Sequence, residues 1–265
     1  MVHEPQTWHY GLVARWWAEF NTAGPEIAYF QKLIASYGQP ALDVACGTGR
    51  LLLPYLRAGL DVDGCDISPD MLALCREKAE REGLSPRLYR QAMHALDIPR
   101  TYKTILVCGA FGLGGDPQQD QEALRRFYRH LAPGGVLVLD LYLPYQHFER
   151  WQYWVRDKRR QLPEAWPPSG QQRRAADGSE YVLRLRLVAL DPLQQLMTLQ
   201  IRVEVWRQGQ LLAAEERTLQ ERLYFRNELL MLLQQAGFGD ITVHGAYTDA
   251  EATAEHDILV FIARK

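Results

Sequence analysis

The sequence predicts an α/β protein built on a doubly wound, mostly parallel sheet, with a small antiparallel β insert. Three observations support this prediction. Residues 41–66 read as strand, glycine turn, helix and strand, and they end on an acid. Short apolar strands alternate with helices over residues 41–141, and the alternation returns over residues 226–265. Between them, residues 142–225 change to the two-residue period of antiparallel strands.

Length and composition are ordinary for a globular protein. The chain has 265 residues and a formal net charge of −2, which gives no electrostatic case for a nucleic-acid or membrane partner. No apolar run approaches the ~20 residues that span a bilayer, and no secretory signal pattern is visible at the start. The four cysteines form no CxxC pair, so we expect reduced thiols, no metal site and a cytoplasmic protein.

An aromatic segment and a helix precede the first strand. Residues 1–24 are rich in tryptophan and tyrosine, and residues 15–20 are predicted to form one or two helical turns. Gly24-Pro25 then starts a helix that runs to about Tyr37, because proline is favoured at the first helical position.

The first strand, residues 41–46, ends in the turn Gly47-Thr48-Gly49, and the second strand ends on Asp66. Glycines let a ligand approach the backbone, and an acid at the tip of the second strand can accept both hydroxyls of a ribose. A dinucleotide would need a third glycine where Leu52 stands, and a P-loop would need Gly-Lys-Ser/Thr after the turn. The layout therefore favours a nucleoside that carries no phosphate.

The following elements continue the alternation. Ser68-Pro69-Asp70 predicts a helix start, with a hydroxyl cap and a proline at the first helical position. A third strand is expected over residues 84–91 and a fourth, almost entirely apolar strand over residues 104–108. A helix over residues 118–131 then leads to Pro133-Gly134-Gly135, which turns the chain into the fifth strand.

Residues 142–225 form the insert. Its first part, residues 142–174, is rich in aromatic, proline and basic residues. Residues 181–188 and 198–205 then alternate apolar and polar side chains, and a third run reaches Phe225. This pattern predicts an antiparallel meander with one face exposed to solvent. The chain closes with a helix and two strands, expected at residues 226–236, 241–246 and 258–263.

Two motifs resemble those of a known family. Leu-Asp-Val-Ala-Cys-Gly-Thr-Gly-Arg, at residues 42–50, is similar to the glycine motif of class I S-adenosylmethionine (SAM)-dependent methyltransferases. Leu-Ala-Pro-Gly-Gly, at residues 131–135, resembles a second motif of that family. The resemblance implies a Rossmann-like seven-stranded sheet whose last strand is antiparallel. It implies a SAM-binding domain over residues 1–141 and 226–265, with residues 142–225 as an inserted lid or substrate domain.

The resemblance also implies a site for SAM, with S-adenosylhomocysteine as product. Gly47 and Gly49 would face the methionine and ribose part, and Asp66 the ribose hydroxyls. Asp43 would meet the methionine ammonium or, equally, order the turn. Gln91 stands where the family often has an acid for the adenine amine. The expected cofactor contacts are Tyr10, Arg15, Asp43, Ala45, Gly47, Thr48, Gly49, Asp66, Ile67, Met71, Gln91, Ala92, Met93, Cys108 and Gly109.

In methyl transfer from a sulfonium, the methyl group is already activated by the positive sulfur. The protein therefore mainly positions the two reactants and excludes water. The sequence accordingly shows no Ser-His-Asp set and no metal cluster. Candidates for a base are Tyr142, Tyr145 and His147, which follow the fifth strand and are explained as well by lid or surface positions.

The implied function is methyl transfer to nitrogen or oxygen of a small-molecule acceptor, by a monomer or homodimer. Basic and aromatic residues interleave over residues 150–174, which keeps an RNA-modifying methyltransferase as an alternative. A second alternative is a non-catalytic nucleoside-binding or interaction protein.

Overall fold

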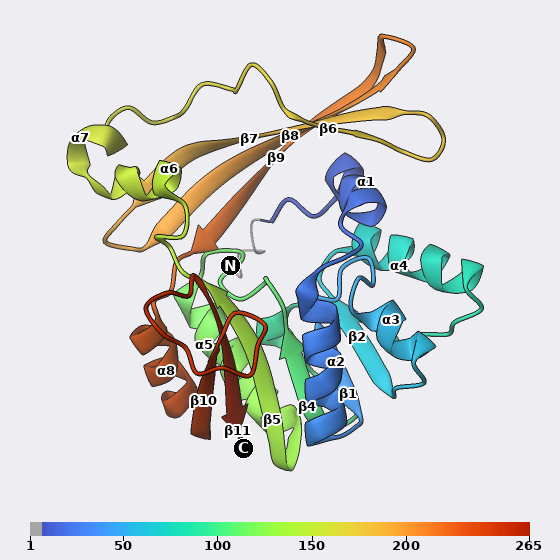
Figure 1. The fold of residues 1–265 in the computed structure, drawn as a ribbon, viewed down its shortest axis with the longest axis vertical. Coiled ribbons are helices and arrows are strands. Elements are labelled where there is room, and N and C mark those ends of the chain that lie inside the picture. Colours follow the sequence, from blue (N-terminus) through green and yellow to red (C-terminus); the bar gives the residue numbers. More distant parts are fainter. Residues whose placement is uncertain (1–6) are drawn as a thin grey trace. The chain divides into compact units, whose positions relative to one another are not determined.

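The computed structural model describes residues 7–265, which divide into two compact units (Figure 1). The larger unit consists of residues 23–111, 117–146 and 224–265. The smaller unit consists of residues 112–116, residues 147–223 and the described residues up to Thr22. The N-terminal segment, which we expected with the cofactor domain, therefore groups with the insert. The functional division between a cofactor domain and a lid stays a prediction.

The larger unit is built on a seven-stranded sheet with the order β10-β11-β5-β4-β1-β2-β3. The strands are β1 Ala41–Val44, β2 Val62–Asp66, β3 Leu88–Arg90, β4 Tyr102–Val107, β5 Leu131–Tyr142, β10 Gly239–Gly245 and β11 Ile258–Arg264. The first five strands pair in parallel, whereas β11 pairs antiparallel with both β5 and β10. The predicted doubly wound sheet with an antiparallel last strand is confirmed.

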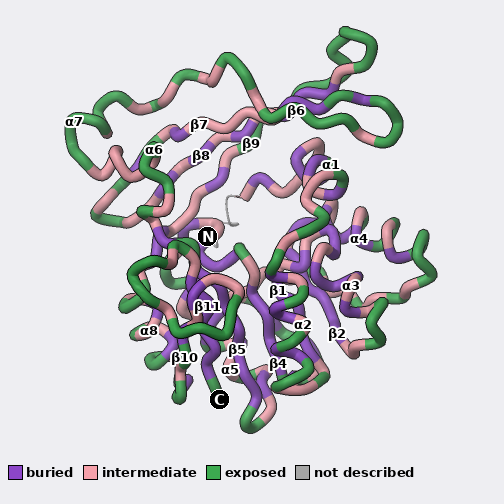
Figure 2. The backbone as a smooth tube through the Cα atoms, in the orientation of Figure 1, coloured by how far each residue is buried: buried purple, intermediate pink, exposed green. Residues whose placement is uncertain are grey.

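The helices of this unit are α2 Pro25–Tyr37, α3 Leu52–Arg57, α4 Pro69–Arg81, α5 Pro117–His130 and α8 Arg226–Gln235, with a 3-10 turn η1 at Met93–Ala95. Helices α2, α4 and α8 begin where the sequence signals place them. Ser68 caps α4, because its Oγ accepts a hydrogen bond from the Met71 N–H at 3.2 Å. Strand β1 is wholly buried, β4 is buried except at Lys103, and β5 is buried from Val136 to Leu141, as parallel strands covered on both faces should be (Figure 2).

Two strands are shorter than expected. The first strand ends at Val44 because Ala45 has a φ of 57° and already belongs to the turn. The third strand covers only Leu88–Arg90, because it is the edge of the sheet and pairs with β2 at three positions. The fifth strand is longer than expected, because β5 begins at Leu131 and includes the predicted Pro133-Gly134-Gly135 turn. The order of strands and helices was predicted correctly, and the boundaries follow backbone geometry.

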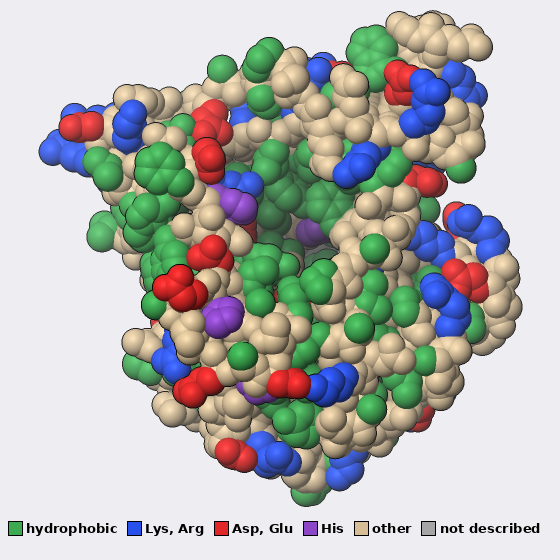
Figure 3. Space-filling model, viewed as in Figure 1, with side chains coloured by type: hydrophobic (Ala, Val, Ile, Leu, Met, Phe, Trp, Pro, Cys, Tyr) green, Lys and Arg blue, Asp and Glu red, His purple; other side chains and the backbone are tan. Residues whose placement is uncertain are grey.

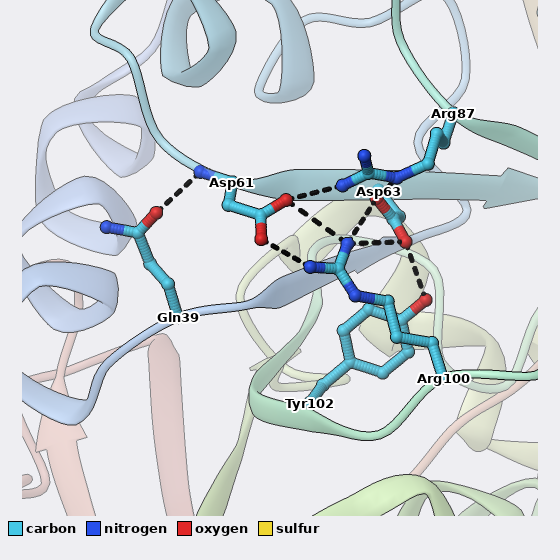
Figure 4. A network of polar contacts seen from close by, with 6 residues as sticks. All are labelled: Gln39, Asp61, Asp63, Arg87, Arg100 and Tyr102. Atoms are coloured by element: carbon cyan, nitrogen blue, oxygen red, sulfur yellow. Dashed lines mark hydrogen bonds and ion pairs between the residues drawn. The ribbon is translucent and has the colours of Figure 1, made fainter.

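A polar network joins the amino-terminal ends of β2 and β4 (Figure 4). The Asp63 carboxylate has no exposed surface and accepts hydrogen bonds from Arg87 Nε at 2.6 Å and Arg100 Nη1 at 3.0 Å. The Tyr102 hydroxyl donates to the same carboxylate at 2.9 Å, and Asp61 accepts from both arginines. These contacts satisfy a buried charge at the opposite end of the strands from the turns described below.

The smaller unit is an antiparallel sheet of order β6-β7-β8-β9, with α1 Gly11–Phe20. Its strands are β6 Gln171–Arg174, β7 Glu180–Asp191, β8 Leu196–Arg207 and β9 Gln210–Arg222, with α6 Phe148–Trp151, η2 Gln152–Trp154 and α7 Arg156–Arg159 before them. The predicted antiparallel insert is confirmed, and β6 adds a fourth strand. Its apolar face, including Ile201 and Val203, packs with Val13 and Trp16 of α1. Helix α1 is the partner of the meander that the sequence did not reveal.

Candidate functional site

Two glycines at the carboxyl ends of neighbouring parallel strands border open space. Gly47 follows β1 and Gly109 follows β4, with φ values of 55° and 59° that favour glycine. A Cβ added to Gly47 would approach no atom closer than the Ala45 carbonyl oxygen at 4.0 Å. At Gly109 it would meet only Tyr142 Cε2, also at 4.0 Å. Because strand order reverses between β1 and β4, this is where doubly wound sheets bind ligands. We call Gly47 and Gly109 the glycine cradle.

Gly49 borders packed side chains rather than open space. It also has a positive φ, 83°, but an added Cβ would lie 2.7 Å from Leu53 Cγ and 2.8 Å from Cys75 Sγ. No side chain fits there without displacing two packed groups. Gly49 therefore allows helices α3 and α4 to pack against the turn, and its contact with a cofactor stays a prediction.

Asp66 holds the turn that carries Gly47. Its side chain is largely buried, Oδ2 accepts the Gly47 N–H at 2.9 Å, and Oδ1 accepts the Ser68 N–H at 2.8 Å. Burial raises the pKa of this carboxyl, while the hydrogen bonds from Ser68, Gly47 and Ile67 oppose the rise. A carboxylate has about four acceptor positions, so these three hydrogen bonds leave room for a hydroxyl donor.

Asp43 carries a buried oxygen with no partner. The residue is 2% exposed, and no donor in the described part of the chain reaches its Oδ2. Burial raises its pKa to about 8, with a further contribution from the charge of Asp66 and a lowering contribution from the Leu52 N–H. Buried polar atoms without a partner are rare in folded proteins. Asp43 therefore fits a site whose ligand supplies a cation or a donor.

The amide of Gln91 is already engaged. Its Nε2 donates to the Asp97 carbonyl at 3.0 Å, and its Oε1 accepts the Asp97 N–H at 2.8 Å. These bonds close the loop that contains η1. Ala92, Met93 and Ile67 are partly exposed, and the roles of all four residues toward adenine stay predictions.

The structure places the remaining candidates as follows. Met71 is 2% exposed and packs in the core, and the Thr48 Oγ1 accepts from Lys78 Nζ at 3.4 Å. Tyr142 and Tyr145 are 41% and 43% exposed in the larger unit. The other three candidates, Tyr10, Arg15 and His147, belong to the smaller unit. The assigned roles of all of these residues stay predictions.

The sequence did not single out Asp140, the acid in β5. It is 3% exposed and accepts hydrogen bonds from the Gly109 N–H at 2.5 Å, Cys108 Sγ at 3.3 Å and the Tyr247 hydroxyl at 2.8 Å. The Tyr247 hydroxyl also bonds the Tyr142 hydroxyl at 3.0 Å. Asp140 had a sequence signal, because it lies near the end of a parallel strand as Asp66 does. Tyr247 had none, because only the sheet order brings the β10–β11 loop to β5.

Arg50 is a cation whose charge acts on Asp140. It forms an ion pair with Glu26 of α2, and its Nη2 donates to Cys108 Sγ at 3.7 Å. Its charge lowers the pKa of Asp140, against the larger effect of burial. The four cysteines are free thiols, and the described residues contain no group of His, Cys, Asp or Glu that could hold a metal. None of the described helices is long and apolar enough to cross a bilayer.

Comparison with known sequences identifies the class. Residues 41–135 match the family described as a methyltransferase domain. The demethylmenaquinone methyltransferase of Thermus thermophilus is 40% identical over 101 residues, which is 37% of this chain and 44% of that protein. The alignments with the first three sequence relatives cover only 44% to 59% of their lengths.

Solved structures resemble the chain over nearly its whole length. The sugar N-methyltransferase KedS8 from Streptoalloteichus covers 100% of both chains, with a TM-score of 0.68 and 19% identity. The methyltransferase CcbJ from Streptomyces caelestis covers 95% of each chain, with a TM-score of 0.69 and 20% identity. The fold is thus a Rossmann-like methyltransferase fold. Residues 41–135 thus resemble a methyltransferase domain, and the chain shares the fold of SAM-dependent methyltransferases of known structure.

Proposed function

We propose that this protein is a SAM-dependent methyltransferase that transfers a methyl group to nitrogen or oxygen of a small-molecule acceptor. The observation that carries the proposal is the open glycine cradle beside the buried, unpaired oxygen of Asp43. A nucleoside with a cationic amino-acid tail fits both features. The same cradle lacks the third glycine that a dinucleotide pyrophosphate requires.

In this proposal, different residues of the site bind different parts of SAM. Gly47 and Gly109 let the backbone approach the ligand, and Asp66 offers its remaining acceptor position to a ribose hydroxyl. Asp43 offers a carboxylate to the methionine ammonium, which would stabilise its ionised form and lower its pKa from about 8. The bound SAM would supply a methyl group already activated by the sulfonium. The protein then has to align the acceptor and exclude water.

The choice of nitrogen or oxygen rests on the full-length structural neighbours. KedS8 is named as a sugar N-methyltransferase, and CalS10 from Micromonospora echinaspora, as an amino pentose methyltransferase, covers 99% of both chains at a TM-score of 0.63. The menaquinone relative aligns with only 37% of this chain. Acceptor choice usually depends on parts added to a scaffold, so similarity that includes the insert is the better guide.

The alternatives find less support. In the basic segment, Arg159 Nη1 donates to the carbonyls of Tyr153 and Trp154 at 3.2 and 2.9 Å. Arg174 forms an ion pair with Glu180. On the face drawn in Figure 3, acidic and basic side chains are interspersed rather than gathered into one basic field. An RNA partner would need a continuous basic track.

The test is transfer of radiolabelled methyl from SAM, offered separately to mixed amino sugars, mixed hydroxyl compounds and bulk RNA. We expect label in a small-molecule fraction, loss of transfer in Asp43→Asn, and parent-like transfer in the control Asp240→Asn, whose side chain is 78% exposed. Label confined to RNA would establish the RNA alternative. SAM binding without transfer to any fraction would support the non-catalytic alternative.

A further inference from the structure

A hydrogen-bonded chain leads from a buried carboxylate to the edge of the glycine cradle. Asp140 Oδ2 accepts from the Tyr247 hydroxyl at 2.8 Å, and that hydroxyl bonds the Tyr142 hydroxyl at 3.0 Å. The inner end is 3% exposed, whereas Tyr142 is 41% exposed. Tyr142 Cε2 is also the one atom within 4.0 Å of a Cβ placed on Gly109. The outer tyrosine therefore borders the open space proposed for the cofactor.

The donors fix the direction of this chain. Asp140 accepts from the Gly109 N–H, Cys108 Sγ and Tyr247, which is the pattern of an ionised carboxylate. The Tyr247 hydroxyl has one hydrogen, and it donates that hydrogen to a bond with Asp140. The Tyr247 oxygen therefore accepts the hydrogen bond from the Tyr142 hydroxyl. The lone pairs of the Tyr142 oxygen then remain available to a hydrogen-bond donor of a bound ligand. The exposed end of the chain is a hydrogen-bond acceptor.

We propose that Tyr142 receives a proton from the N–H or O–H of the methyl acceptor and that Tyr247 and Asp140 carry it inward. This inference rests on the proposed methyltransferase function. As the acceptor proton binds the Tyr142 oxygen, the Tyr142 proton moves to Tyr247, and the Tyr247 proton moves to Asp140 Oδ2. The acceptor keeps the electron pair of its broken N–H or O–H bond, and Asp140 becomes a neutral carboxylic acid. That lone pair then forms the bond to the methyl carbon while the carbon–sulfur bond of SAM breaks.

The surroundings of Asp140 suit it to take up a proton. Burial raises the pKa of its carboxyl, because a charge is costly away from water. The hydrogen bonds from the Gly109 N–H, Tyr247 and Cys108 and the charge of Arg50 oppose that rise. Arg50 is itself paired with Glu26, so its charge is partly balanced. Tyr142 would be the catalytic residue, with Tyr247 and Asp140 as positioning residues behind it.

The first test uses Tyr142→Phe and Tyr247→Phe. Tyr128→Phe is the control, because it removes the hydroxyl of a tyrosine in α5 whose ring packs on Phe238. The probe is a mixture of D-glucosamine, D-galactosamine and ethanolamine, followed by S-adenosylhomocysteine release across a pH series. We expect kcat to fall by about 10²–10⁴-fold in both relay variants, with a changed pH profile. SAM affinity by calorimetry should stay within about threefold, and the control should match the parent. Parent-like kcat and pH profile in Tyr142→Phe would overturn the proposal.

The second test needs no acceptor. Carbon-13 NMR of aspartate-labelled protein follows the Asp140 carboxyl, identified by the resonance missing in Asp140→Asn. We expect Asp140 to be ionised at neutral pH and its pKa to rise in Tyr247→Phe, because the carboxylate loses a donor. An Asp140 that is already protonated at neutral pH, or one indifferent to Tyr247→Phe, would overturn the relay. A protein that fails to bind SAM refutes the proposed function itself, and calorimetry separates that result from failure of the relay.

Discussion

Replacing Asp43 with asparagine should stabilise the ligand-free protein and weaken its binding of SAM. The folded chain holds this carboxyl at a pKa of about 8, against an ordinary value of 3.8, mainly because it is buried. Between these pH values the folded chain keeps a proton that the unfolded chain has released. The free energy of unfolding therefore falls as pH rises through this window. The asparagine variant should not show that fall.

The size of the effect follows from the two pKa values. An independent group with this difference would change the free energy of unfolding by about 6 kcal/mol at most. Asp66 lies close enough to share the effect, and local relaxation reduces it. We expect Asp43→Asn to gain on the order of 2 kcal/mol over the parent at pH 8 and little at pH 4.

Binding should change in the opposite direction. Loss of a charge-assisted contact with the ammonium should cost about 1.5–3 kcal/mol, which is roughly a 10- to 150-fold weaker Kd. In the parent, Asp43 should release a proton when SAM binds near neutral pH, so the measured binding enthalpy should differ between phosphate and Tris buffers. The variant should show a smaller difference.

Urea unfolding at both pH values and calorimetry in both buffers measure these effects. Asp240→Asn is the matched control, because that acid is exposed and lies at the far edge of the sheet. An equal pH dependence of unfolding in parent and Asp43→Asn would refute the assignment of a buried, protonated Asp43. Unchanged SAM affinity in the variant would refute its proposed role toward the ammonium.

Three further predictions concern the turn, the ion-pair network and the smaller unit. Gly49→Ala should lower the free energy of unfolding by about 1–3 kcal/mol more than Gly47→Ala in urea titrations, because a Cβ at Gly49 meets packed atoms and one at Gly47 does not. Gly47→Ala should instead weaken SAM binding. Arg100→Ala should destabilise the protein by about 3–5 kcal/mol in the same assay by leaving the buried Asp63 under-compensated, with SAM affinity unchanged. Trp16→Ala should lower the free energy of unfolding by about 3–5 kcal/mol in thermal or urea unfolding, because the Trp16 side chain of α1 packs on the meander and is 5% exposed. A decrease below 1 kcal/mol would contradict that packing.

The larger unit could be predicted well because its signals are local. A buried run ending in glycine, a Ser-Pro-Asp cap and a Pro-Gly-Gly turn each fix backbone geometry within a few residues. The seven-stranded sheet follows from these signals and the family resemblance together. Gly47 and Asp66 were predicted from the same kind of local signal, and a hydrogen bond joins them within one βαβ unit, while their contacts with a cofactor stay predictions.

The rest depended on contacts between distant segments. Tyr247 reaches Asp140 across 107 positions of sequence, and α1 covers a sheet that begins more than 150 residues later. No local pattern encodes either pairing. Gln91 was expected near adenine because of its position after the third strand. Its amide also bonds the backbone of Asp97, six residues on, and its role toward adenine stays a prediction.

The most direct test of the central claim is an equilibrium titration of the purified protein with SAM, S-adenosylhomocysteine and NAD. The glycine cradle, with Asp43 beside it and no third glycine, predicts saturable binding of the first two ligands at a single site. It predicts that NAD binds at least about 100-fold more weakly, a difference of ~2.7 kcal/mol. Binding of NAD as tight as that of SAM, or no binding of either SAM or its product, would contradict the account.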